Sequence, residues 1–242
     1  MNPSPERLRV AAVGDLHVGE DDVRPYADLF AEVSETADVA VLCGDLTNHG
    51  KLREAEILAD DVAGCRVPVL GVLGNHDYEC GRSAEVAELL RAAGMRLLDG
   101  QPTVIDGVGF AGCKGFVGGF GRAMLSAFGE PELKTFVQAS IDESLKLEAS
   151  LRMLRTDRTV VVLHYAPVPD TLVGEPLEIY PFLGCSRLGE TVDRFDNVSL
   201  VLHGHAHKGS REGVTPRGRP VRNVARPLLS RETDRSFAVF EV

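Results

Sequence analysis

Residues 8–15 read LRVAAVGD, an apolar run that ends in glycine and aspartate, and two later stretches repeat the design: AVLCGD at 40–45 and PVLGVLGN at 68–75. Each run has the length and apolar character of a buried strand. Apolar residues at helical spacing follow the runs, at residues 22–38, 51–63 and 83–93. Because strands that alternate with helices form mostly parallel sheets covered by helices, the first 95 residues predict an α/β fold.

The rest of the chain is expected to add strands, one long helix and two loops. The strands are predicted at residues 103–105, 108–112, 159–163, 198–202, 220–224 and 237–242, and the helix at about 132–154. A glycine-rich loop at 112–121 and a proline-containing loop at 166–186 are expected to border the functional site, since long loops in compact domains are usually functional. The chain has no internal repeat. Single α/β domains of 242 residues are common, and we expect one domain over residues 1–242.

The composition of the chain indicates which partners it can bind and in which cellular compartment it is expected. The formal net charge of -10 argues against a nucleic-acid duplex as the main partner. It does not exclude a small phosphorylated substrate, because metals can supply the local positive charge. The five cysteines form no close CxxC pair and suit a reducing cytosol. The N-terminus lacks the apolar core of a signal peptide, and no apolar run reaches the ~20 residues of a membrane span. We therefore expect a cytoplasmic protein without a membrane span.

Residues that bind metals or transfer protons follow the predicted strands: Asp15, His17, Asp45, Asn75, His76, Asp77, His164, His205 and His207. In open α/β sheets, ligands lie beyond the carboxyl ends of the strands. Carboxylates and imidazoles together suit Mn, Fe, Zn or Co. Since an aspartate offers two oxygens, it can bridge two metals, and a metal pair ~3.5–4 Å apart can clamp a phosphate and generate hydroxide at neutral pH.

The order of these motifs resembles the calcineurin-like metallophosphoesterase family, in particular its small bacterial phosphodiesterase-like branch. The motifs D-x-H, GD, GNHD, H and GHxH appear here as Asp15-Leu16-His17, Gly44-Asp45, Gly74-Asn75-His76-Asp77, His164 and Gly204-His205-Ala206-His207. They span residues 14–207, most of the chain. The resemblance implies two mixed β-sheets packed as a sandwich flanked by helices. It also implies a dinuclear-metal phosphoesterase that acts on a small phosphodiester or phosphomonoester.

The resemblance implies a role for each matching position. One metal would bind Asp15, His17 and His207, the other would bind Asn75, His164 and His205, and Asp45 would bridge them. A metal-bridging hydroxide would attack phosphorus in line. His76 would stabilise the developing charge or protonate the leaving oxygen, and Asp77 would orient the His76 imidazole.

Several alternatives stay open at this point. A nuclease of the same fold would need a basic groove or an added domain, and a non-catalytic metal-binding scaffold would be expected to have a broken ligand set. His203 is read as a structural residue beside the ligands, and His49 as either a surface residue or a substrate contact. Lys114 and Arg122, on the glycine-rich loop, are candidates for contacting a phosphate. The native metal, the substrate and the oligomeric state are not readable from the sequence.

Overall fold

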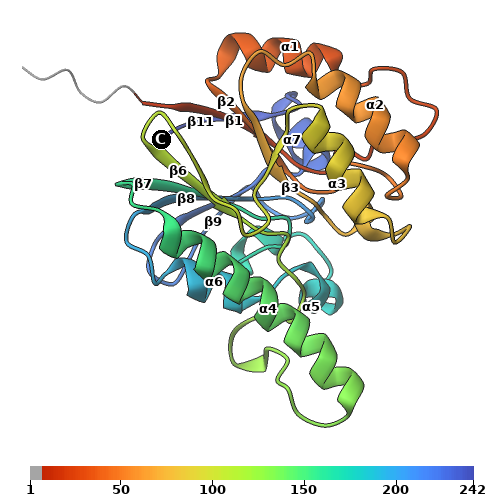
Figure 1. Cartoon of the computed structure of the whole chain (residues 1–242). Coiled ribbons are helices and arrows are strands. Elements are labelled where there is room, and N and C mark those ends of the chain that lie inside the picture. Colours follow the sequence, from red (N-terminus) through yellow and green to blue (C-terminus); the bar gives the residue numbers. More distant parts are fainter. Residues whose placement is uncertain (1–6) are drawn as a thin grey trace, which may run out of the picture.

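A computed structural model describes residues 7–242 and arranges the strands in two mixed sheets (Figure 1). The first sheet has the order β11-β1-β2-β3-β4 and the second has the order β5-β6-β7-β8-β10-β9. The strands of the first sheet are β1 (Arg9–Val13), β2 (Val39–Cys43), β3 (Val69–Val72), β4 (Arg96–Leu97) and β11 (Ala238–Glu241). Those of the second are β5 (Thr103–Ile105), β6 (Val108–Gly112), β7 (Arg158–Val162), β8 (Val198–His203), β9 (Glu212–Val214) and β10 (Pro220–Asn223). The predicted pair of mixed sheets is thus confirmed.

The two sheets pack face to face through one apolar core. Val10, Val41 and Val72 of the first sheet and Phe110 and Val162 of the second belong to the same buried cluster. The central strands are buried on both faces, which explains why their sequences are continuous apolar runs and do not alternate with polar residues.

Helices cover the outer face of each sheet. The α-helices within residues 7–242 are α1 (Ala27–Thr36), α2 (Leu52–Val62), α3 (Ser83–Ala92), α4 (Pro131–Met153), α5 (Tyr180–Leu183), α6 (Ser186–Val192) and α7 (Arg226–Thr233). Helices α1, α2 and α3 pack on the first sheet, while α4 and α6 pack on the second (Figure 1). None of the helices in the described part of the chain combines the length and the apolar character that a membrane crossing demands.

The structure adds elements that the sequence patterns did not predict. Strand β4 has two residues and β9 has three, which is too short for periodicity to register. Helix α7 starts with Arg226-Pro227 and is rich in charged residues, so no apolar stripe marks it. The loop predicted at 166–186 contains two short 3₁₀ helices and α5.

Parallel pairing brings the carboxyl ends of the strands to one edge of the sandwich. β1, β2 and β3 are parallel neighbours in the first sheet, and β6, β7, β8 and β10 are parallel neighbours in the second. The loops after β1 and β10 also join the sheets, because the Gly14 amide donates to the Val224 carbonyl oxygen at 2.9 Å. Segments far apart in the sequence therefore meet at this edge.

Candidate metal centre

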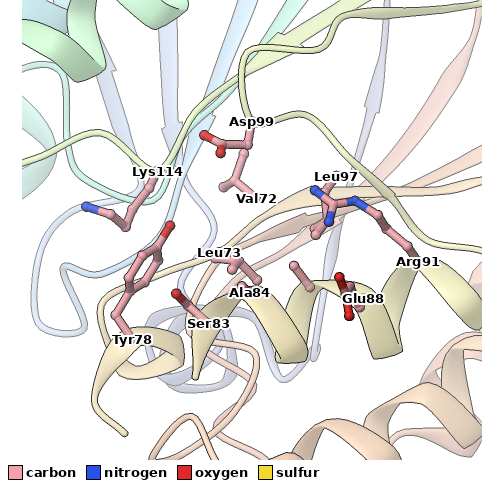
Figure 2. A pocket seen from close by; sticks show the side chains of 11 residues that line it. Val72, Leu73, Tyr78, Ser83, Ala84, Glu88, Arg91, Leu97, Asp99 and Lys114 are labelled. Carbon is pink, nitrogen blue, oxygen red and sulfur yellow. The ribbon is translucent and has the colours of Figure 1, made fainter. Parts of the chain in front are cut away.

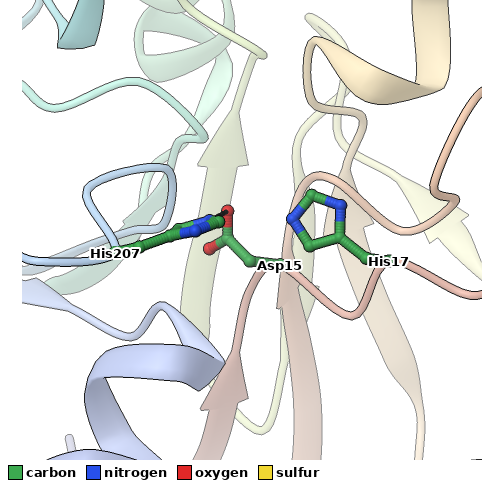
Figure 3. Close-up of side chains that lie close together, drawn as sticks. All are labelled: Asp15, His17 and His207. Atoms are coloured by element: carbon green, nitrogen blue, oxygen red, sulfur yellow. Dashed lines mark hydrogen bonds and ion pairs between the residues drawn. The ribbon is translucent and has the colours of Figure 1, made fainter.

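The predicted ligands converge in two groups at this edge. The first group is Asp15, His17 and His207, and the second contains Asp45, His164 and His205; within each group the ligand atoms lie within 4.8 Å of one another, as do those of His17, Asp45 and His76. Figure 3 shows Asp15 between the imidazoles of His17 and His207. The residues come from the loops after β1, β2, β7 and β8, so both sheets contribute.

The carboxylate of Asp45 lies between the two groups. Its Oδ1 is 3.3 Å from Nε2 of His164, while its Oδ2 is 3.9 Å from Nε2 of His17. The side chain is 2% exposed, so solvent does not compete for these oxygens. Each oxygen of Asp45 thus faces a different group of ligands.

In the second group, two atoms that can only accept hydrogen bonds face one another: Nε2 of His164 and Oδ1 of Asn75. The Nδ1–H of His164 donates to the Cys43 carbonyl oxygen at 2.9 Å, so Nε2 carries a lone pair. That lone pair faces Oδ1 of Asn75 at 2.9 Å. Burial holds the pKa of His164 well below its ordinary value of 6.5, which keeps the ring neutral. Such a set of acceptors fits a cation, and a carbonyl that fixes the imidazole tautomer is the usual partner of a metal-binding histidine.

The first group fits a cation for a similar reason. Nε2 of His17 is buried and has no hydrogen-bond partner in residues 7–242. Burial lowers the pKa of His17 to about 4 and that of His205 to about 3, so both rings are neutral, as metal ligation requires. Burial also raises the pKa of Asp15 to about 6, although His207, whose Nε2 lies 3.0 Å from Asp15 Oδ1, opposes the shift. A metal ion would stabilise the ionised carboxylate.

The backbone of the ligand loops is strained. Asp15, His17, Asp45 and His205 have φ angles of 60°, 48°, 50° and 71°, in the left-handed region that side chains rarely adopt. Such conformations cost about 1–3 kcal/mol each and cluster at functional sites. The loops after β1 and β2 hold one another in place, since the Asp15 and His17 amides donate to the carbonyl oxygens of Gly44 and Asp45 at 2.9 and 3.0 Å.

The comparisons with known proteins bear on this geometry. Residues 8–209 match the calcineurin-like phosphoesterase family. The chain belongs to this family. The match covers most of the strands and all the motifs of the candidate centre, and it makes the protein a metal-dependent phosphoester hydrolase.

Solved structures support the fold of this phosphoesterase. It resembles the phosphopantetheinyl hydrolase from Mycobacterium tuberculosis with a TM-score of 0.68 and 14% identity, over 99% of this chain and 97% of that one. It resembles TT1561 of Thermus thermophilus with a TM-score of 0.61 and 16% identity, over 97% of this chain and 99% of that one. No match is found among the curated proteins.

The glycines of the phosphoesterase motifs allow the ligand loops to approach closely. A Cβ on Gly74 would lie 2.2 Å from the Asp45 amide nitrogen and from Oδ1 of Asp45. A Cβ on Gly204 would lie 2.5 Å from Oδ2 of Asp15. Of the glycines that precede ligands, only Gly44 has a positive φ, of 80°. It is the ligand residues themselves that adopt most of the left-handed conformations.

Replacing Gly74 with alanine is expected to displace the Asp45 carboxylate and to lower kcat/KM by at least ~100-fold, because misplacing a reacting group by about 1 Å has that effect. Steady-state hydrolysis of p-nitrophenyl phosphate would measure the loss. Gly19→Ala is the matched control, since its Cβ would meet Asp22 Oδ2 at an ordinary 3.5 Å. Equal activity of the two variants would show that the close approach of Gly74 to Asp45 is not needed.

His76 lies beside the candidate centre, but Asp77 is not the residue that orients its imidazole. Nδ1 of its ring donates to the Asn48 carbonyl oxygen at 2.6 Å, and Nε2 lies 4.0 Å from Oδ2 of Asp45. The Asp77 carboxylate instead accepts hydrogen bonds from the Gly74 amide at 2.7 Å and from the Thr47 amide and hydroxyl at 2.8 and 2.6 Å. Asp77 therefore ties the loops after β2 and β3 together, and the Asn48 carbonyl orients the His76 imidazole.

The remaining histidines have other partners. His203 is fully buried, with Nε2 2.8 Å from the Thr171 hydroxyl and Nδ1 2.8 Å from the Gly204 carbonyl oxygen, which agrees with a structural role. His49 is half exposed and its Nδ1 lies 3.1 Å from Oε2 of Glu79. The part played by the Asn48 carbonyl has no signal in the sequence, because every residue carries a carbonyl group.

Proposed function

We propose that the enzyme binds two transition-metal ions, Mn, Fe, Zn or Co, and hydrolyses a small phosphodiester or phosphomonoester. Asp15, His17 and His207 would hold one ion, Asn75, His164 and His205 would hold the other, and Asp45 would bridge them. The observation that carries the proposal is the Asp45 carboxylate, whose Oδ1 faces His164 at 3.3 Å while Oδ2 faces His17 at 3.9 Å. The proposed mechanism follows from what the residues around that carboxylate can do.

When bound, the metals would supply Lewis-acid charge for the phosphate oxygens and lower the pKa of a water molecule so that it becomes a nucleophile. The protein holds the reacting groups in place. Asp77 fixes the loops that carry Asp45 and Asn75 through hydrogen bonds to backbone amides. The Asn48 carbonyl holds the proton on Nδ1 of His76, which directs Nε2 toward the Asp45 carboxylate. In the imidazolium form of the ring Nε2 carries a proton as well, and this proton can stabilise the developing charge or pass to the leaving oxygen.

We further propose that residues 1–242 act as a single metallophosphoesterase domain, since both sheets supply ligands and share one apolar core. A cytoplasmic location is consistent with the cysteines, because Cys43, Cys65, Cys80, Cys113 and Cys185 are all free thiols. The acidic net charge of -10 favours a small substrate over a nucleic acid.

Metal-stripped protein is expected to hydrolyse neither bis(p-nitrophenyl) phosphate nor p-nitrophenyl phosphate, and adding Mn²⁺ is expected to restore release of p-nitrophenol from at least one of them. The physical reason is that no residue of the candidate centre replaces the Lewis acid. The preferred compound would indicate whether the enzyme favours diesters or monoesters. Unchanged release from stripped and Mn²⁺-loaded protein would contradict the proposal.

A further inference from the structure

A cavity of about 320 Å³ opens beside the candidate metal centre, between the end of β3, helix α3 and the segment that follows β6 (Figure 2). Its middle is apolar, formed by Leu73, Ala84, Ala87 and Leu97. Figure 2 shows Lys114 and Tyr78 at one end, and Glu88 and Arg91 at the other. A volume of this size accommodates a small organic group.

The Lys114 end adjoins the metal centre through continuous contacts. The Lys114 carbonyl oxygen accepts the amides of His164 and Tyr165, both at 3.1 Å. The ring of Tyr165 lies 5.3 Å from that of His164 and 4.6 Å from that of His205. At the cavity, Tyr78 follows His76 by two residues on the same 3₁₀ helix. Lys114 thus stands between the ligands and the cavity.

The ammonium group of Lys114 is suited to an anion. It lies over three aromatic rings, 4.7 Å from the centroid of Phe116, 5.1 Å from Tyr165 and 5.4 Å from Tyr78. Its hydrogen bond goes to the uncharged Gly115 carbonyl oxygen at 2.8 Å.

The other charged groups of the cavity do not favour a second anion. Asp99 is paired with Lys146 at 2.6 Å, and the far end carries one acidic and one basic side chain, Glu88 and Arg91. A group bound between the two ends meets methyl and methylene groups, the Tyr78 ring and the Ser83 hydroxyl. The cavity therefore suits an uncharged, partly apolar body attached to one anionic head.

We propose that this cavity binds the organic substituent of the phosphoester, an uncharged and partly apolar group, while Lys114 contacts an anionic oxygen of the substrate at the boundary with the metal centre. The inference rests on the proposed function, because it takes the phosphate to bind between the two ligand groups. It makes organic phosphoesters the substrates and disfavours inorganic polyphosphates, which offer nothing to the apolar middle of the cavity.

Two phosphonates test the cavity without turnover, since their P–C bond is not hydrolysed by a phosphoesterase. Calorimetric titration of Mn²⁺-loaded protein is expected to give about tenfold tighter binding for 4-phenylbutylphosphonate than for methylphosphonate, the gain that a fitting apolar group gives in a pocket. Ala84→Phe, at an exposed helical position that lines the cavity, should remove the difference in affinity between the two phosphonates and leave methylphosphonate binding intact. Ala31→Phe adds the same ring to an exposed position of α1 and should preserve the difference.

Lys114→Met keeps the side-chain stem over the aromatic rings but removes the charge. It should weaken both phosphonates about tenfold, whereas Lys134→Met, at an exposed position of α4, should weaken neither. Equal binding of the two phosphonates to wild-type protein would overturn the inference. The inference would also be overturned if Ala84→Phe left the ratio of the two phosphonate affinities unchanged, even if the enzyme hydrolyses p-nitrophenyl phosphate. Absence of hydrolysis with the expected binding ratios would instead reject the proposed function.

Discussion

Replacing His76 with alanine is expected to lower kcat by about 10²–10⁴-fold, the usual contribution of a positioned acid or base, while both metals stay bound. The reason is geometric: Nε2 of His76 lies 4.0 Å from the Asp45 carboxylate, close enough to meet a phosphate at the centre, yet the ring belongs to neither of the two ligand groups proposed here. Steady-state kinetics and metal analysis on the same preparation would measure the two quantities.

His49→Ala is the matched control for that change. His49 contacts Glu79, at the end of the 3₁₀ helix that carries His76, but its half-exposed ring lies at the surface. Its removal is expected to change kcat by less than about threefold, in line with surface substitutions. An unchanged kcat for His76→Ala would contradict the role proposed for this imidazole, and loss of metal from that variant would make His76 a ligand.

Replacing Asp45 with asparagine is expected to weaken both metals together, by more than the ~100-fold that loss of an outer-sphere partner produces, and to abolish turnover. The amide keeps the shape of the side chain but removes the charge that both ligand groups share. His207→Ala is the comparison, because it removes one ligand of the first group and should weaken one metal. Calorimetric Mn²⁺ titrations would resolve the two cases. Loss of a single metal from Asp45→Asn would argue against bridging.

The sequence predicted the strand ends well because apolar runs followed by a polar residue mark the carboxyl ends of buried strands. Leu8–Val13 and the following Asp15 illustrate this: β1 is buried, and Asp15 lies at the edge where the other ligands gather. The packing of the two sheets does the rest, since it brings Oδ1 of Asp15, after β1 of the first sheet, to 3.0 Å from Nε2 of His207, after β8 of the second.

What the sequence missed depends on contacts that have no residue-type signal. Asp77 was expected to orient His76, yet its carboxylate is occupied by the Gly74 and Thr47 amides and the Thr47 hydroxyl. A backbone carbonyl, that of Asn48, holds the imidazole instead. The cavity at Lys114 was equally invisible, because its walls come from β3, α3 and the segment after β6, and only the fold brings them together.

The most direct test of a two-metal centre is the metal content of the wild-type protein after Mn²⁺ loading and removal of excess metal, combined with electron paramagnetic resonance of the bound ions. The arrangement of ligands around Asp45 predicts two Mn²⁺ ions per chain with the signal of a magnetically coupled pair, because a single carboxylate would join them. One ion per chain, or two ions that behave as isolated centres, would contradict the bridging role of Asp45 and the dinuclear mechanism.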